Sequence, residues 1–135
     1  SKMRWCIVAD VAKQGLSDES LEDEIPGIEL PPTIASDPTK FEVALISYSL
    51  RFRAASNEYP ITVVTNLIDS RTLTQQGSWH PVIANLDNSQ NKGWLCREIT
   101  NPIYFDLINS GPMLLQIDPY IPDKGFLVFD FRLKQ

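Results

Sequence analysis

Apolar and polar residues alternate along several short segments of the chain, with the period of two that is typical of β-strands. The clearest segment is FEVALISYSLRFR, residues 41–53, in which alternate residues from Ile46 to Phe52 are apolar and are expected to face inward. Its first half is apolar on both faces, which predicts deeper burial at that end. In residues 126–134, alternate positions are apolar in the same way, and Asp130 is expected to point outward.

Seven or eight strands are predicted in this way, over residues 3–12, 41–53, 61–68, 81–86, 94–108, 113–118 and 126–134. Pro102 has no N–H for a strand ladder, so it marks a sheet edge or a bulge within residues 94–108. Residues 69–80 are polar and are expected to form a loop, and no long helix is predicted. Many short strands separated by turn residues indicate an all-β chain. We expect one antiparallel β-sandwich or barrel domain over residues 1–135.

The segment between the first two predicted strands has a different character. Residues 14–39 contain neither Lys nor Arg, and six acidic residues lie between Asp18 and Glu29. The stretch SDESLEDE could form one helical turn, but four prolines after it exclude a long helix. Residues 14–40 are therefore expected to be an extended acidic arm or loop. Its apolar residues argue against free disorder and could dock onto a surface; they are Ile25, Ile28, Leu30 and Ile34.

Composition excludes several classes of protein. The net charge is −5 and the 12 basic residues are scattered, so no direct binding to nucleic acid is expected. No apolar run is long enough for a transmembrane helix, and Asp10 interrupts the first apolar run too early for a signal peptide. We expect an intracellular soluble protein without membrane contacts. Cys6 and Cys96 are then expected to be separate thiols, although a disulfide stays possible.

No assembled catalytic or metal site is evident in the sequence. His80, in a predicted loop, would need a positioned partner for acid–base catalysis, and no serine lies in a nucleophile-elbow motif. The acidic cluster from Asp18 to Glu24 lacks the spacing of a calcium-binding loop, and the glycines stand singly. Asp106, Asp118 and Asp130 are equally explained as outward positions of strands. We expect no catalytic residue, no cofactor and no metal.

Three aromatic residues lie in or next to predicted loops, and they are Trp79, Trp94 and Tyr120. Exposed loop aromatics can stack on sugars or form the centre of a protein interface. They can equally close the ends of a sandwich core without binding anything.

Three stretches resemble motifs of a known protein family. KFEVALISYSL resembles a W-E-V-A-L-x-E-I-S-Y strand, and ITVVTNLIDSRTL resembles a V-Y-T-D-I-I strand. NPIYFDL, followed by LLQID and FLVFDFRLK, resembles an N-P-x-Y-x-P-L … I-x-I … V-x-L-H-F-R ending. Together they are similar to small capsid proteins of Polinton (Maverick) and adintovirus-like elements, in the single-jelly-roll penton or minor capsid class. The similarity runs from Phe41 to Lys134, with Phe41, Asn66 and Asp130 in place of a tryptophan, an acid and a histidine.

The resemblance implies a jelly-roll-like sandwich and a structural subunit without catalytic residues, located in a virion if the chain is viral. We therefore expect a non-enzymatic assembly subunit that forms a homo-oligomer or contacts other assembly proteins. The candidate interface residues are Ile25, Ile28, Leu30, Ile34, Trp79, Trp94 and Tyr120. The first alternative is a β-sandwich module that binds a carbohydrate or peptide through the loop aromatics. The second is an enzyme centred on His80.

Overall fold

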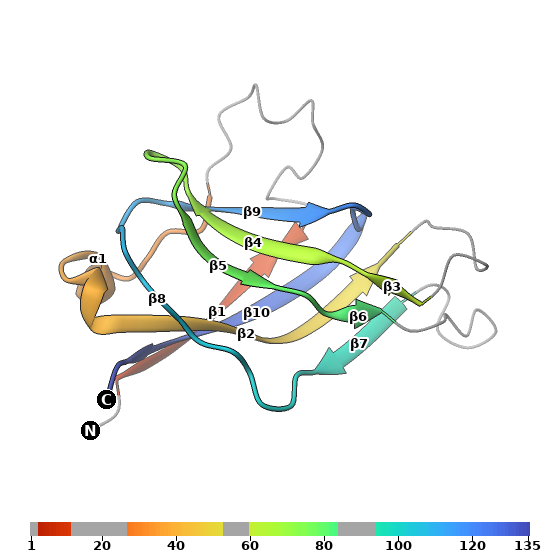
Figure 1. Ribbon diagram of the computed structural model, residues 1–135, viewed down its shortest axis with the longest axis horizontal. Coiled ribbons are helices and arrows are strands. Elements are labelled where there is room, and N and C mark those ends of the chain that lie inside the picture. The colour runs from red at the N-terminus through yellow and green to blue at the C-terminus, as the bar shows by residue number, and fades with distance from the viewer. Residues whose placement is uncertain (1–2, 12–26, 53–59, 84–93) are drawn as a thin grey trace.

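Two antiparallel β-sheets stack face to face in the computed structural model (Figure 1), which describes residues 3–11, 27–52, 60–83 and 94–135. The first sheet has the order β1–β10–β2–β7, made of Arg4–Asp10, Lys124–Leu133, Phe41–Arg51 and Trp94–Glu98. The second has the order β5–β4–β9, made of Gln75–Trp79, Val64–Asp69 and Met113–Asp118. The predicted antiparallel β-sandwich is confirmed.

Short elements complete the sandwich. β3 (Ile61–Thr62) pairs with β6 (Val82–Ile83) and prolongs the β4–β5 hairpin, while β8 (Phe105–Asp106) pairs with the start of β2. The helix α1 (Pro32–Ala35) and the 3₁₀ turn η3 (Pro38–Lys40) lead into β2. α1 has a proline at its first position, which suits a helix start, and Pro38 follows it closely. The prolines therefore keep this part of the arm short and tightly turned.

The strand order is that of a jelly roll. Ile28 adds a one-residue bridge beside β9, because its N–H donates to the Met113 carbonyl at 2.7 Å and its carbonyl accepts the Met113 N–H at 2.9 Å. From β1 the chain passes to this bridge in the second sheet, to β2 in the first, and to the β4–β5 hairpin in the second. It then returns to the first sheet in β7, crosses to the second in β9 and ends in the first in β10. The expected jelly-roll-like arrangement of two sheets is thus present.

A β-bulge shifts the burial pattern of β2. Val128 pairs with Ser47 and Phe129 pairs with Leu45, so Ile46 has no partner in β10. Phe41, Val43 and Leu45 point inward before the bulge, and Tyr48, Leu50 and Phe52 point inward after it. The prediction that Ile46 belongs to the inward face is corrected, since it lies half-buried at the change of phase.

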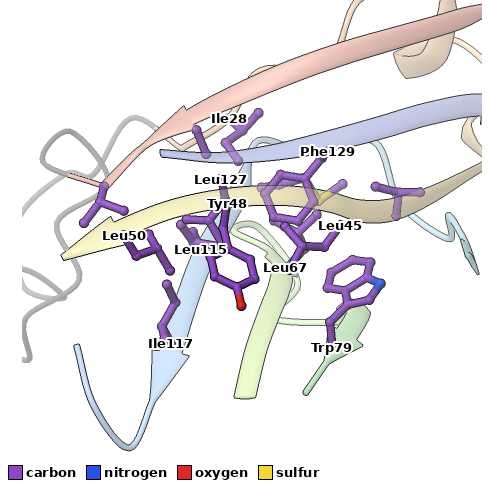
Figure 2. Close-up of a cluster of buried hydrophobic side chains, with 14 of the residues drawn as sticks. Ile28, Leu45, Tyr48, Leu50, Leu67, Trp79, Leu115, Ile117, Leu127 and Phe129 are labelled. Carbon is purple, nitrogen blue, oxygen red and sulfur yellow. The ribbon is translucent and has the colours of Figure 1, made fainter. Parts of the chain in front are cut away.

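The core fills the space between the two sheets (Figure 2). β10 contributes Leu127, Phe129 and Phe131, whose side chains have no exposed surface, and β4 and β9 contribute Leu67 and Met113 from the other side. The predicted inward face of β10 is confirmed. The alternation predicted for β1 is also confirmed, with Ala9 and Val11 buried and Val8 exposed.

β5 lies where the sequence predicts a loop, and that prediction is wrong. Gly77 and Trp79 are the inward residues, and the Trp79 ring lies against the space where a side chain of Gly77 would be. Because an inward position of this strand is occupied by glycine, the alternation of large apolar residues with polar ones is not visible in the sequence. Gln76 is also buried, because its side-chain oxygen accepts the backbone N–H groups of Ile108 at 2.7 Å and Asn109 at 3.1 Å. Of the strand predicted at residues 81–86, Val82 and Ile83 form β6, and residues 84–86 lie outside the described ranges.

Candidate functional site

A cavity of about 350 Å³ opens where the edges of the two sheets approach each other. One wall is the end of β5 with the residues that lead into β6, and the other is the end of β7 with the segment that follows it. Tyr48 and Trp79 contribute aromatic surface, and Arg97, His80 and Asn101 contribute polar groups. The volume is in the range of small-molecule sites.

Trp79 is the best-anchored residue of this cavity. Its indole N–H donates to the Ile103 carbonyl at 2.8 Å, and its ring meets Phe105 edge-on at 5.3 Å and Phe129 at 5.5 Å. Only 4% of its surface is exposed, so it cannot present a ring face for stacking on a sugar. The prediction that Trp79 is an aromatic residue of a loop is wrong, because Trp79 belongs to β5. It packs in the core, where the segment of residues 99–105 covers it.

Arg97 carries the positive charge of the cavity. Its guanidinium donates to the Val82 carbonyl at 3.4 Å, across the gap between the sheets, and the Tyr48 ring lines the same cavity. Burial raises the pKa of Tyr48, and Arg97 partly opposes this rise. Within the described ranges, no carboxylate lies within ion-pair distance of Arg97. The cavity thus joins apolar walls to a cation without an acidic partner there.

His80 and Asn101 lie at the same cavity. His80 Nε2 lies 3.5 Å from the Ser78 hydroxyl, which is the limit of a hydrogen bond, and no acidic side chain of the described part of the chain orients the imidazole. A serine–histidine contact without an acid does not make a catalytic triad. Asn101 has a φ of 56°, a left-handed conformation that few residues other than glycine adopt.

The apolar residues of the arm dock onto their own chain. Ile34 has no exposed surface, and Ile28 and Leu30 are 6% and 8% exposed, all within the main core. The contact expected with a partner is therefore corrected to an intramolecular one, because these side chains close the sandwich between β9 and β2. Ile25 and residues 14–26 lie outside the described residues.

The other two candidate aromatics are only half-buried. Trp94 begins β7, and the Arg51 guanidinium lies 5.9 Å from the centre of its ring. Tyr120 lies in the turn between β9 and β10 and packs against the core. Arg97, near the cavity, is three residues beyond Trp94 in β7. Of the three candidate aromatic residues, Trp79 alone lines the cavity, while Trp94 lies toward the other end of β7.

Sequence reasoning missed a polar cluster on the outer face of the first sheet. Asp130 is only 3% exposed; it accepts the Tyr104 hydroxyl at 2.6 Å and pairs with Arg4 at 3.2 Å. The Arg132 guanidinium stacks 3.4 Å from the centre of the Tyr104 ring and donates to Glu42 at 2.6 Å. Burial raises the pKa of Tyr104, and the Asp130 carboxylate raises it further. Asp130 does point outward as expected, but Tyr104 reaches over it from a segment 26 residues away.

The two cysteines do not meet. Cys6 lies in β1 and Cys96 in β7, the opposite edges of the first sheet, and both are exposed free thiols. Three strand spacings, about 14 Å, separate the two strands, and the cysteines are further offset along the sheet, since Cys96 pairs with Ser49 while Cys6 lies level with Ala44 of β2. A disulfide needs Cα atoms within about 7 Å, so these thiols cannot pair within one chain.

In the described ranges, no three His, Cys, Asp or Glu side chains gather in a way that could hold a metal ion. Those ranges also hold no helix that is long and apolar enough to cross a membrane. No protein-family model matches the chain, and neither a curated protein nor a solved structure matches it.

Proposed function

We propose that this chain is a non-enzymatic structural subunit that acts through contacts with other protein subunits, as in a viral or virus-like capsid. The observation that supports this most is the jelly-roll strand order, since viral capsid proteins are among the main users of this architecture. The resemblance of three stretches to motifs of the single-jelly-roll capsid class agrees with this proposal.

Exposed apolar side chains on two separate surfaces also support the proposal. Val8 and Phe126 are 58% and 47% exposed on the outer face of the first sheet. Leu73 and Ile108 are 72% and 57% exposed at the α1 end, where Asn109 hydrogen bonds Thr72 and holds the two segments together. A subunit with more than one neighbour needs more than one contact surface, whereas a monomeric binding module needs none of these.

The solution mass tests this proposal. Light scattering over a range of concentrations is expected to give a multiple of the monomer mass of 15.3 kDa. Leu73→Asp and Ile108→Asp would place a charge in the contact at the α1 end and are expected to lower that mass. The matched control is Gln75→Asp, which adds the same charge at an exposed position two residues from Leu73. A protein that stays monomeric at every concentration would refute the proposal.

The cavity beside Trp79 favours a second candidate function, which is binding a small peptide or other molecule that ends in a carboxylate. Arg97 can receive that carboxylate, since the described residues offer the guanidinium no acid, and the apolar walls can receive the adjoining side chain. Asn101 also lines the cavity and adds a neutral polar side chain to it.

A pair of peptides distinguishes this candidate from a plain surface hollow. N-acetyl-Phe-Phe with a free carboxylate is expected to bind in an NMR titration, and the same peptide with a C-terminal amide is expected to bind much more weakly. Arg97→Gln should remove this difference, while Arg71→Gln, at a separate hollow beside Asp69 and Ile108, should keep it. Equal binding of the acid and the amide, or an unaffected Arg97→Gln protein, would exclude the site.

A further inference from the structure

β1 is an edge strand of seven residues that pairs with β10 on one side. Along the described part of the chain, no strand pairs with its other side. Its central residues, from Trp5 to Ala9, include no charged residue and no proline. Charged side chains and prolines are the usual means by which proteins block an edge strand against pairing. An edge of this kind is a template for another strand.

The backbone directions along this edge follow from the ladder. The Leu133 N–H donates to the Met3 carbonyl at 3.1 Å, so Met3 is bonded toward β10. Because the ladder continues in register, Trp5, Ile7 and Ala9 are also bonded toward β10. The backbone groups of Arg4, Cys6, Val8 and Asp10 consequently point away from β10.

β1 is complementary to a second copy of itself in one antiparallel register, with the two-fold axis at Ile7. In this register Arg4 faces Asp10 of the copy, Cys6 faces Val8, and Ile7 faces Ile7. These pairs bring the outward backbone groups of even-numbered residues opposite each other, as an antiparallel ladder requires. The two central pairs bring apolar side chains together, and Arg4, which pairs with Asp130 of its own chain, would also face a carboxylate of the copy.

The side chains on both faces agree with the same register. On the inner face, the large Trp5 would lie opposite the small Ala9 of the copy. On the outer face, Val8 of each copy adjoins Val128, its own partner in β10, and Phe126 is 47% exposed nearby. Joining the edges would make one apolar strip from the separate outer patches.

We infer that β1 pairs with β1 of a second copy about an axis at Ile7, so that two first sheets join into one continuous sheet. The inference rests on the proposed assembly function and names one of its contacts. The partner is a second copy of this chain, and the contact is isologous, which means that both copies use the same surface.

Disulfide trapping tests the register. In a background with Cys6→Ser and Cys96→Ser, Ile7→Cys would place two thiols on the axis in a non-hydrogen-bonded pair, with Cα atoms about 4.5 Å apart, suitable for a disulfide. Air oxidation is expected to give a covalent dimer on a non-reducing gel. Ala9→Cys in the same background is the matched control, because its two thiols would lie about 13 Å apart.

A proline in β1 tests the backbone pairing with the second copy and leaves the hydrogen bonds between β1 and β10 intact. The Val8 N–H points to the free edge, so Val8→Pro removes no bond to β10, and edge strands tolerate proline at such positions. It would remove a hydrogen bond on each side of the axis, and the dissociation midpoint should rise about tenfold or more relative to Val8→Thr. Circular dichroism would show that both variants keep their sheets.

The outcomes separate the contact from the function. A covalent dimer of the Ile7→Cys protein but not of the Ala9→Cys protein, together with weaker assembly of the Val8→Pro protein, supports the pairing. A native chain that assembles while the Ile7→Cys protein does not cross-link, or while the Val8→Pro and Val8→Thr proteins assemble equally, overturns the pairing and leaves the proposed function standing. A native chain that is monomeric throughout overturns both.

Discussion

Asp69 shows how a single carboxylate organises one end of the sandwich. It is 1% exposed at the end of β4, and it accepts backbone N–H groups from Arg71 at 2.8 Å, Thr72 at 3.1 Å and Gly111 at 2.8 Å. Burial alone would raise the pKa of Asp69, but the three backbone donors and the Thr72 hydroxyl together lower it. The charged form is therefore the one that the fold stabilises.

Asp69→Asn should lower the free energy of unfolding by about 2–3 kcal/mol at pH 7, because an amide nitrogen would replace one of the two accepting oxygens. The folded pKa of Asp69 is depressed, so its contribution is present above the unfolded value of about 3.9 and is lost as pH falls through the folded value. Urea unfolding of both proteins should show the difference shrinking below about pH 4. Asp106→Asn, at an exposed pair with Lys134, is the control and should cost under about 0.5 kcal/mol. A difference that stays constant down to about pH 2 would contradict this account.

Part of this residue-level detail is readable from the sequence. An Asp followed by polar residues is a turn former, because its side chain can accept the N–H groups two and three positions later. The contact with Gly111, 42 residues away, cannot be read in this way. The same limit explains Asp130, whose outward direction follows from the alternation but whose burial depends on the distant Tyr104.

At the scale of elements, alternation predicted the strands whose inward residues are large. It succeeded for β1, β9 and β10, where an apolar side chain recurs at every second position. It failed for β5, because Gly77 occupies an inward position and Gln76 is buried through hydrogen bonds to another segment. It also missed the phase change at Ile46, since a bulge in β2 depends on the register with β10. Pro102 was a reliable sign, as the chain leaves the sheet between β7 and β8.

Gly125, the second residue of β10, is required for the pairing of β10 with β2. Its φ is 127°, a conformation that residues with a side chain rarely adopt, and a Cβ atom there would overlap the Ser49 carbonyl oxygen in β2. Gly125→Ala should lower the free energy of unfolding by about 2–4 kcal/mol, from backbone strain and from overlap together. Urea denaturation measures the loss, and Lys124→Ala at the exposed neighbouring position should change it by less than about 0.5 kcal/mol. Equal stabilities of the two variants would mean that β10 can shift away from β2 at little cost.

At the scale of the molecule, the sandwich class follows from the sequence and the order of its strands does not. Every strand that hides one face needs a second layer, and that argument suffices for two stacked sheets. Which strand lies beside which depends on contacts such as Ile28 with Met113, far apart along the chain, that no local pattern records. The aromatic residues illustrate the difference, since Trp79 and Trp94 looked alike in sequence. One of them joins the two sheets and the other lies half-buried at the start of an edge strand.

A comparison of these two tryptophans tests how the sheets are held together. Trp79→Phe removes the indole N–H bond to Ile103, leaves that carbonyl without its donor, and opens space between Phe105 and Phe129. It should therefore cost about 2–3 kcal/mol of unfolding free energy. Trp94→Phe loses part of a contact with Arg51 on a half-buried side chain, and it should cost less than about 1 kcal/mol. Thermal or urea unfolding of the two variants gives both numbers. If Trp94→Phe lowered the free energy of unfolding more than Trp79→Phe, Trp79 would not be the main contact between the sheets. The predicted order follows because the Trp79 side chain contacts residues of the first sheet from a strand of the second, whereas Trp94 contacts a neighbour within its own sheet.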